Sequence, residues 1–365
     1  MRNLTIGFIG LGLIGGSVAR SLRKMYPEFT IMAYSRSAST TQMAMEENLI
    51  DKICEKNDPA FSECDYIFLC APVQTNITYL PFLKEIIQPN CIITDVGSVK
   101  GLMHTAIREV GLSDNFIGGH PMAGSEKTGL ESSTDYMFEN AYYFITPEPG
   151  ISKERIDEFT ELVSATKALT LVMPPEKHDF IVAGISHLPH IMASCLVNTV
   201  KGLDTEDQDM KRVAAGGFKD ITRIASSSPE MWQQICLTNP IQISSVLGTF
   251  IEKLQYAKSL VDAAASEELI SMFSSSKNYR DSLLDLRTHN ALSNFFYTDM
   301  RDESGGIATL TVLLAVKGIS IRDIGIIHNR EYEQGVLRIE FYNTVDMDAA
   351  KEILTKNNYV IYEPK

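Results

Sequence analysis

The first half of the chain alternates short apolar runs with stretches of helical periodicity. Apolar runs that predict strands occur at residues 4–9, 30–34, 65–73, 91–98, 116–121, 141–146 and 168–173. Several of them are almost uninterrupted, which is typical of parallel strands buried on both faces of a sheet. Between the last two, a helical stretch at 152–165 carries Ile156, Phe159 and Leu162 on one face. The pattern predicts an α/β domain over residues 1–174, which ends at Pro174-Pro175.

From residue 175 onward the periodicity becomes helical and strand patterns nearly disappear. Helices are predicted at residues 181–200, 207–215, 229–237 and 240–264. We therefore expect an all-α second domain over residues 175–292. A helical domain in this position commonly closes over a cofactor and supplies a dimer face, so we expect a homodimer.

The last segment, residues 293–365, returns to a mixed pattern. Strands are predicted at 295–300, 319–328, 335–343 and 359–362, and helices at 304–317 and 346–356. The resulting order βαββαβ is that of a ferredoxin-like unit. Because this segment contains no cluster of catalytic residue types, we expect it to bind a ligand rather than to perform chemistry.

A glycine motif follows the first predicted strand. Gly10, Gly12 and Gly15 stand between that strand and a helical stretch that reaches Leu22. In this spacing the first glycine permits a sharp turn, the second lets a pyrophosphate approach the backbone, and the third lets the helix pack closely. The helix N-terminus also offers unpaired N–H groups and a positive dipole end to phosphates. A structural glycine turn is the alternative, but the flanking strand and helix favour a Rossmann-type dinucleotide-binding domain. The residues expected to contact the cofactor here and after the strand 65–73 are Gly10, Gly12, Leu13, Ile14, Gly15, Ala71 and Pro72.

The preference between NAD and NADP depends on the end of the second predicted strand. An acidic residue about twenty positions beyond the glycines usually binds the ribose 2′-hydroxyl. Ser35 stands there instead, with Arg36 beside it. Serine and arginine suit a 2′-phosphate, so this pair favours NADP. The alternative is that Arg36 is a solvated surface residue over an NAD site.

Composition narrows the classes of partner. The formal net charge of −13 argues against nucleic acid or an anionic membrane as the main partner. The six cysteines show no close pairing, which indicates reduced core residues. No run approaches the roughly twenty uninterrupted apolar residues that a membrane span needs. The apolar N-terminal run is interrupted by glycines and lacks a signal-cleavage site, so we expect a cytoplasmic protein.

Residues 118–129 form the densest cluster of glycine and polar residues, and His120 lies within it. A neutral imidazole at the C-terminal edge of a parallel sheet can polarise or deprotonate a substrate hydroxyl during hydride loss. A hydrogen-bonded loop histidine is the alternative. The surrounding glycines and the predicted sheet edge favour a functional role.

Two further polar stretches lie in the helical region. Residues 186–190 place His187 and His190 three apart at a predicted helix start, but no third ligand lies nearby, so we expect no metal. Substrate contact or structural hydrogen bonding explains them better. Arg223 lies in a predicted polar loop, where by itself it fits a surface ion pair with Asp220. The residues alone thus predict an NAD(P)-dependent oxidoreductase with an unnamed substrate.

Five motifs in order resemble those of the prephenate dehydrogenases of tyrosine biosynthesis, and the resemblance spans essentially the whole chain. They are Gly-Leu-Gly-Leu-Ile-Gly-Gly-Ser at 10–17, Thr-Asp-Val-Gly-Ser-Val-Lys at 94–100, Gly-His-Pro-Met-Ala-Gly-Ser-Glu at 119–126, Ser-His-Leu-Pro-His at 186–190 and Asp-Ile-Thr-Arg-Ile-Ala at 220–225. The resemblance implies NAD(P)-dependent oxidative decarboxylation of prephenate to 4-hydroxyphenylpyruvate.

The same resemblance implies roles for individual residues. His120 would accept the proton of the substrate hydroxyl, Ser98 would orient His120 or that hydroxyl, and Arg223 would pair with a substrate carboxylate. The other implied substrate-site residues are His190, supported by His187 and Ser186, and Glu126, which would pair with Arg223 when no substrate is bound.

The tail resembles an ACT regulatory domain, through residues 302–307 and 326–330. ACT modules typically bind amino acids, so tyrosine, the end product, is the expected effector. The expected contacts are Gly305, Gly306, Ile307 and Asn329. A purely structural dimerisation module is the alternative.

Three other functions remain to be distinguished. Arogenate, which carries an amino group in place of the side-chain ketone, is the close alternative substrate. Another β-hydroxyacid dehydrogenase would place a catalytic lysine in a long helix of the second domain, and residues 181–200 contain none. A non-catalytic amino-acid sensor would be favoured only without His120 and Arg223, which are both present.

Overall fold

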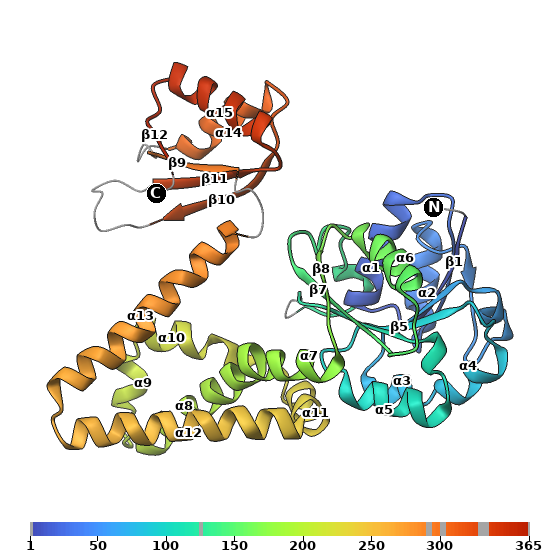
Figure 1. Ribbon diagram of the computed structural model, residues 1–365, viewed down its shortest axis with the longest axis horizontal. Helices are drawn as coiled ribbons and strands as arrows, with labels where there is room; N and C mark the ends of the chain where they lie inside the picture. The colour runs from blue at the N-terminus through green and yellow to red at the C-terminus, as the bar shows by residue number, and fades with distance from the viewer. Residues whose placement is uncertain (1–2, 124–126, 290–293, 300–303, 328–335, 364–365) are drawn as a thin grey trace. The chain divides into compact units, whose positions relative to one another are not determined.

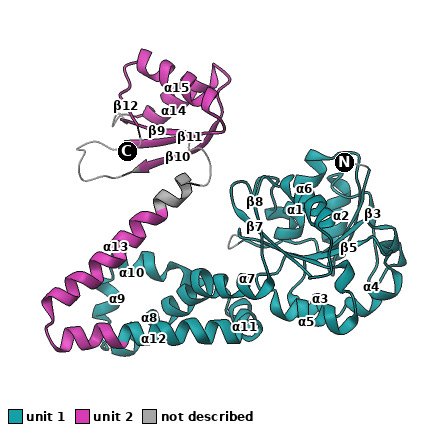
Figure 2. Ribbon diagram, in the orientation of Figure 1, with its two compact units in different colours: residues 1–254 teal, residues 255–365 magenta. Residues whose placement is uncertain are grey.

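The computed structural model describes residues 3–123, 127–289, 294–299, 304–327 and 336–363. By its internal contacts the chain divides into two compact units, Met1–Leu254 and Gln255–Lys365 (Figure 2). The division falls inside helix α12 (Pro240–Asp262). Each unit is described separately below.

A five-stranded parallel sheet forms the centre of the first unit. Its order is β3-β2-β1-β4-β5, which is the strand order of a Rossmann dinucleotide-binding fold. The strands are β1 (Thr5–Ile9), β2 (Thr30–Tyr34), β3 (Lys52–Ile53), β4 (Tyr66–Leu69) and β5 (Ile92–Asp95). The predicted α/β class is therefore confirmed.

A three-stranded sheet continues beside β5. It consists of β6 (Ile117–Pro121), β7 (Tyr142–Pro147) and β8 (Leu169–Val172), in that order. Sequence patterning treated β6 as one more parallel strand. It is parallel to β5 only through a bridge between Ile93 and Phe116, and it pairs antiparallel with β7.

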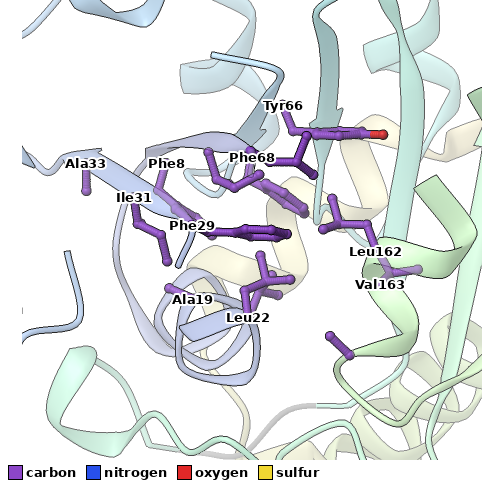
Figure 3. Close-up of a cluster of buried hydrophobic side chains, with 14 of the residues drawn as sticks. Phe8, Ala19, Leu22, Phe29, Ile31, Ala33, Tyr66, Phe68, Leu162 and Val163 are labelled. Carbon is purple, nitrogen blue, oxygen red and sulfur yellow. The ribbon is translucent and has the colours of Figure 1, made fainter. Parts of the chain in front are cut away.

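Helices cover both faces of these sheets (Figure 1). They are α1 (Leu13–Met25), α2 (Ala38–Glu46), α3 (Val73–Ile77), α4 (Leu80–Ile86), α5 (Gly101–Val110) and α6 (Lys153–Ser164). Alternate strand residues face opposite sides: Phe68 packs with Leu22 and Leu162 (Figure 3), while Ile67 packs with Leu83. Burial on both faces explains the nearly uninterrupted apolar runs.

The first helix of the helical part begins earlier than predicted. The helix expected at 181–200 starts at Pro175 and runs through α7 (Pro175–Val182), the π-helical turn η4 (Ala183–His187) and α8 (Leu188–Leu203). Proline is favoured in a first helical turn because its missing N–H needs no partner there. Residues 186–190 therefore lie inside a continuous helix, and the predicted helix start is wrong. The π-helical turn directly precedes the segment with Pro189, whose ring cannot join a regular hydrogen-bond ladder.

This continuous helix is long and apolar enough, by length and composition alone, to cross a membrane. Its sequence contains no uninterrupted apolar run of that length, because polar residues divide it. Two of these residues, His178 and Asp179, are buried against the α/β part.

The remaining helices of this part follow α8 along the chain, and α10 and η5 pack against it. They are α9 (Asp209–Val213), α10 (Gly216–Thr222), the 3₁₀ turn η5 (Arg223–Ser226), α11 (Pro229–Thr238) and α12. The polar loop predicted around Arg223 is thus wrong, because α10 and η5 occupy it. Helical structure here fits the predicted all-α class.

The second unit contains α13 (Ser266–His289) and a small sheet with two helices. Its elements are β9 (Phe295–Asp299), α14 (Gly306–Ala315), β10 (Ile321–Ile327), β11 (Val336–Phe341), α15 (Thr344–Lys356) and β12 (Ile361–Tyr362). The element order is the predicted βαββαβ, and the antiparallel sheet has the order β10-β11-β9-β12. Phe296, Leu310, Ile339 and Leu354 belong to its core.

Candidate active site

The glycine loop joins β1 to α1 with the geometry that its spacing predicts. Gly10 has φ +95°, which residues with a side chain rarely adopt. A Cβ at Gly15 would lie 2.6 Å from the Gly10 carbonyl oxygen, whereas a Cβ at Gly12 would meet no heavy atom within 4 Å. The open space is therefore confined to the glycine expected to face a pyrophosphate.

The N-terminus of α1 fits an anionic group. Gly12 is its N-cap, so no side chain caps the first turn, and that turn contains no acidic residue. Its N–H groups and positive dipole end are therefore available to a phosphate. The residues present thus fit the phosphates of a dinucleotide.

A pocket of about 320 Å³ lies between the sheet edge and α11. Ala71 and Pro72 line it after β4, and Ser98 lines it after β5. Gln234 and Thr238 contribute from α11. The structure thus brings two predicted cofactor contacts and one predicted catalytic residue into a single pocket at the C-terminal ends of parallel strands, where α/β proteins bind ligands.

Ser35 and Arg36 directly follow β2, next to the glycine loop. The Gly10 N–H donates to the Tyr34 carbonyl at 2.8 Å, which places the end of β2 beside the loop. Ser35 is half-buried and Arg36 is exposed. The NADP preference stays a prediction.

His120 lies at the end of β6 and is 8% exposed. Its Nδ1 is 2.8 Å from Nε2 of His178, and Nδ1 of His178 is 2.8 Å from Oδ1 of Asp179. Both of these partners come from α7. Among the described residues, His178 rather than Ser98 is therefore bonded to the His120 Nδ1.

A buried ion pair holds the peptide next to His120. Lys100 is fully buried, and its Nζ donates to Asp95 Oδ2 at 2.5 Å and to the Gly119 carbonyl at 2.6 Å. Asp95 also accepts the Gly119 N–H at 3.3 Å. The residue before His120 is thus bonded on both sides, which fixes where the imidazole begins.

The surroundings keep His120 neutral. Burial lowers its pKa well below the usual range, and the nearby His178, Lys100 and His187 lower it further. Burial lowers the pKa of His178 as well, although Asp179 opposes this. Burial raises the pKa of Asp179, but hydrogen bonds from His178 and two backbone N–H groups outweigh it and leave the pKa lowered. A neutral imidazole can accept a proton, which is what a general base requires.

A second cluster lies farther along the same continuous helix. The His190 ring stacks on Trp232 with centroids 3.7 Å apart, and His187 meets the Trp232 ring edge-on at 6.0 Å. Burial lowers the pKa of His187 to about 4. Asn239 joins this cluster to the first, because its amide lies 3.4 Å from His187 Nδ1 and donates to the Asp179 carbonyl at 2.9 Å.

The arginine expected to bind the substrate lies beside this second cluster. Burial and the charge of Arg223 lower the pKa of His190, whereas a hydrogen bond with the Ile224 backbone raises it. Arg223 itself is exposed, and Ser186 is half-buried in the π-helical turn. The roles of Arg223 and Ser186 at the substrate site stay predictions.

Some predicted residues lie elsewhere or are not described. Glu126 and Asn329 lie outside the described residues, while Gly305 caps the N-terminus of α14 with φ +86° and precedes Gly306 and Ile307. Within the part of the chain that the structure describes, no group of three His, Cys, Asp or Glu could hold a metal ion.

Sequence reasoning missed several residues of the site. They are Lys100, His178, Asp179, Trp232 and Asn239. Lys100 belongs to a motif already noted, yet a lysine in a polar segment gives no sign of being fully buried. The adjacent pair His178-Asp179 was the available signal, because both side chains can carry protons.

Comparisons with known proteins agree with this geometry. The sequence model "Prephenate dehydrogenase, nucleotide-binding domain" matches residues 18–172, and "Prephenate dehydrogenase, dimerization domain" matches residues 174–275. The prephenate dehydrogenase of Bacillus subtilis is 36% identical over 354 residues, which covers 96% of this chain and 95% of that protein. That of Lactococcus lactis is 34% identical and covers 95% of this chain and 96% of that protein.

Solved structures give the same result for about three quarters of the chain. Prephenate dehydrogenase from Aquifex aeolicus, in complex with hydroxyphenyl propionate and NAD⁺, superposes with a TM-score of 0.72 at 32% identity. The match covers 78% of this chain and 99% of that one. Synechocystis arogenate dehydrogenase has a TM-score of 0.70 at 28% identity and covers 77% of this chain and 100% of that one. The chain belongs to the prephenate dehydrogenase family, whose members are NAD-dependent oxidoreductases.

Proposed function

We propose that the protein catalyses the NAD(P)-dependent oxidative decarboxylation of prephenate to 4-hydroxyphenylpyruvate in tyrosine biosynthesis. The observation that carries this proposal is His120, a buried and neutral histidine at the end of β6, in the same unit as a dinucleotide-type glycine loop between β1 and α1. Relatives named prephenate dehydrogenases that align over nearly the whole chain support it.

In this reaction the bound nicotinamide supplies the hydride acceptor. His120 accepts the hydroxyl proton of prephenate as the carbon bearing that hydroxyl loses hydride and becomes carbonyl-like. Loss of CO₂ from the ring carbon opposite completes an aromatic ring, which drives the reaction forward. The protein's task at this end of the substrate is to keep His120 neutral and correctly oriented.

The other end of the substrate carries two carboxylates, one on the ring and one on the side chain. Arg223 pairs with one of them through its planar guanidinium. His190, His187 and Ser186 contact the substrate or support those that do, Glu126 pairs with Arg223 in the free enzyme, and Ser98 contacts the substrate hydroxyl. The position of Ser98 in the pocket that Ala71 and Pro72 also line supports its part in this arrangement.

Arogenate is the second candidate substrate. The likeness to an arogenate dehydrogenase of Synechocystis favours it, because the two chains share a fold over that whole protein. Prephenate and arogenate differ only where a ketone replaces an amino group. The residue that meets this group would decide between them.

For the cofactor we retain both nicotinamide dinucleotides. The Aquifex relative holds NAD⁺, whereas Ser35 and Arg36 in place of an acid favour NADP. An Arg36→Ala variant separates the two. It should raise the KM for NADP⁺ and leave the KM for NAD⁺ unchanged if Arg36 contacts a 2′-phosphate.

We further propose that residues 293–365 form an ACT-type module of ferredoxin-like topology that binds tyrosine. The element order βαββαβ and the glycine start of α14 support this. Gly305, Gly306, Ile307 and Asn329 are the expected contacts.

A cytoplasmic homodimer completes the proposal. Exposed apolar side chains of the helical part, among them Phe180, Ile185 and Ile241, support a dimer face. They belong to the segment that matches the family's dimerization domain.

One assay tests the proposed reaction, cofactor and effector together. Reduced-cofactor absorbance is followed with prephenate or arogenate, crossed with NAD⁺ or NADP⁺, in the presence and absence of tyrosine. We expect turnover with prephenate and inhibition by tyrosine. Absence of signal in every combination would refute the dehydrogenase, and turnover that tyrosine does not change would refute only the effector.

A further inference from the structure

A chain of hydrogen bonds runs from His120 through His178 to Asp179. We propose that His178 and Asp179 are positioning residues that hold His120 in the tautomer with an unprotonated Nε2 and receive the positive charge that His120 acquires. This inference rests on the proposed function, because it concerns how His120 accepts the substrate proton.

The tautomer of His120 follows from Asp179, at the end of this chain of hydrogen bonds. Asp179 is a carboxylate, so it can only accept, and the His178 Nδ1 must carry the hydrogen between them. A neutral His178 then has a bare Nε2, which must accept a hydrogen bond from His120 Nδ1–H. His120 is thereby left with a bare Nε2. That is the nitrogen able to accept a proton from a substrate hydroxyl.

Asp179 is itself held rigidly. Its Oδ1 accepts the Lys100 N–H and its Oδ2 accepts the Gly101 N–H, each at 2.8 Å, at the start of α5. These two bonds aim the carboxylate at the N-terminus of a helix, where the dipole stabilises negative charge. Because Asp179 cannot turn, the direction of the whole chain is fixed.

His178 is fixed by packing as well as by hydrogen bonds. Its ring meets the Phe144 ring edge-on with centroids 5.1 Å apart, and the side chain is fully buried. The imidazole therefore keeps both nitrogens aligned with their partners. It presents a defined acceptor to His120.

The hydrogen bond between His120 and His178 also allows the positive charge that His120 acquires to move to His178. When His120 Nε2 gains the hydroxyl proton, the O–H bond breaks and an imidazolium forms close to Lys100 and His187, both of which disfavour it. Transfer of the Nδ1 proton to His178 Nε2 breaks one N–H bond and forms another, and it returns His120 to neutrality. The charge then lies on His178, where the Asp179 carboxylate favours it, although Lys100, itself paired with Asp95, disfavours it there as it does on His120.

The first test compares two buried histidines. His178→Phe keeps an aromatic ring but removes both hydrogen bonds, so kcat should fall by about 10²-fold or more while the Kd for the cofactor stays unchanged. The matched control is His104→Phe. His104 is also buried, bonded to a carboxylate, Glu148, and edge-on to a phenylalanine, Phe116, at 5.0 Å. The kcat of His104→Phe should stay within about threefold of that of the wild-type protein.

Equal losses of kcat in the two variants would overturn the proposal, as would wild-type kcat in His178→Phe. A second measurement does not depend on turnover or on the stability of a His178 variant. Imidazole-¹⁵N NMR of the wild-type protein, with His120→Asn used for assignment, should find His120 protonated at Nδ1 and bare at Nε2. A proton on Nε2 in the neutral state would overturn the proposal even if the enzyme proves to act on another substrate.

Discussion

At the scale of single residues, the site depends on histidines that burial keeps neutral. His120 is neutral because burial, and then the neighbouring His178 and Lys100, keep its pKa low, so a ring nitrogen is available to accept a proton. A group with a low pKa is a weak base in water. The His120 imidazole is, however, held by hydrogen bonds in one orientation. Its role as proton acceptor therefore depends on its position rather than on a high pKa.

Replacement of His120 tests this role. His120→Asn should lower kcat by about 10²-fold or more, because the amide cannot take up the hydroxyl proton. The cofactor should still bind, since the glycine loop lies on other elements. Isothermal titration with NAD⁺ and steady-state kinetics measure the two effects. Near-normal turnover would remove His120 from the mechanism.

Arg223 is expected to act on binding rather than on chemistry. Arg223→Ala should raise the KM for prephenate by a factor equivalent to about 2 to 4 kcal/mol, because a substrate carboxylate loses its charged partner. Arg223→Lys keeps the charge without the two parallel bonds, so it should recover part of the loss. A KM for prephenate that does not change in Arg223→Ala would return the residue to a surface role.

Among residues, the sequence could identify those whose type and spacing carry a function by themselves. The glycines and His120 belong to that class. His178 and Asp179 do not, because their importance arises from a fold that brings α7 against the start of α5. Lys100 likewise lies in a noted motif, yet only packing makes it a fully buried cation.

At the scale of elements, two glycines between β1 and α1 have different roles: Gly12 leaves space for a cofactor, and Gly15 allows the helix to pack closely. A Cβ at Gly12 would meet no protein atom within 4 Å, so Gly12→Ala should leave the melting temperature nearly unchanged. It should raise the Kd for the cofactor about tenfold or more, equivalent to about 1.4 kcal/mol, because the methyl group enters the pyrophosphate's space. Cofactor titration checks this.

Gly15 provides the matched contrast. A Cβ there would lie 2.6 Å from the Gly10 carbonyl oxygen and 2.9 Å from the Cys70 Cβ. Gly15→Ala should therefore lower the free energy of unfolding by about 1 to 3 kcal/mol. If Gly12→Ala destabilised the fold as strongly as Gly15→Ala, the space at Gly12 would not be a ligand site.

The helices were harder to predict than the strands. Buried parallel strands are recognisable as apolar runs, and the strand predicted at residues 30–34 has the bounds of β2. The π-helical turn was missed because no residue pattern distinguishes it from a regular helix. As a result, the sequence pattern predicts a helix start at residues 186–190, whereas these residues lie where two helical segments meet.

At the scale of the whole molecule, buried neutral histidines make stability depend on pH. The pKa of His187 is about 4 in the folded protein because of burial, against 6.5 when exposed. The unfolded chain therefore binds a proton that the folded chain refuses. This histidine's contribution is fully present above pH 6.5 and is lost as the pH falls toward 4.

The loss from His187 alone amounts to roughly 3 kcal/mol across that range. Urea unfolding at a series of pH values should give a free energy of unfolding that falls steadily below neutral pH. In the His187→Asn variant the free energy of unfolding should fall less steeply with decreasing pH, because about one proton fewer is taken up on unfolding. Parallel curves for the two proteins would contradict the burial of a neutral His187.

The assembly of the whole chain could be predicted in outline. Changes in periodicity near residues 174 and 292 predict three segments, because a parallel sheet, a helical region and a small antiparallel sheet each need different patterns; these bounds stay a prediction, and the compact units of the structure divide at Leu254 and Gln255 instead. The antiparallel pairing of β6 with β7 was not readable, since a buried strand looks alike in either direction. A ligand for the second unit could be named only by resemblance.

In the proposed reaction, one site removes hydride and CO₂ from the same molecule, with His120 as proton acceptor. The most direct measurement follows both products at once, using prephenate labelled in its ring carboxylate. Reduced nicotinamide and labelled CO₂ should appear in equal amounts in the wild-type protein, and both should fall together in His120→Asn. Reduced cofactor without CO₂, or equal rates in the two proteins, would contradict the account.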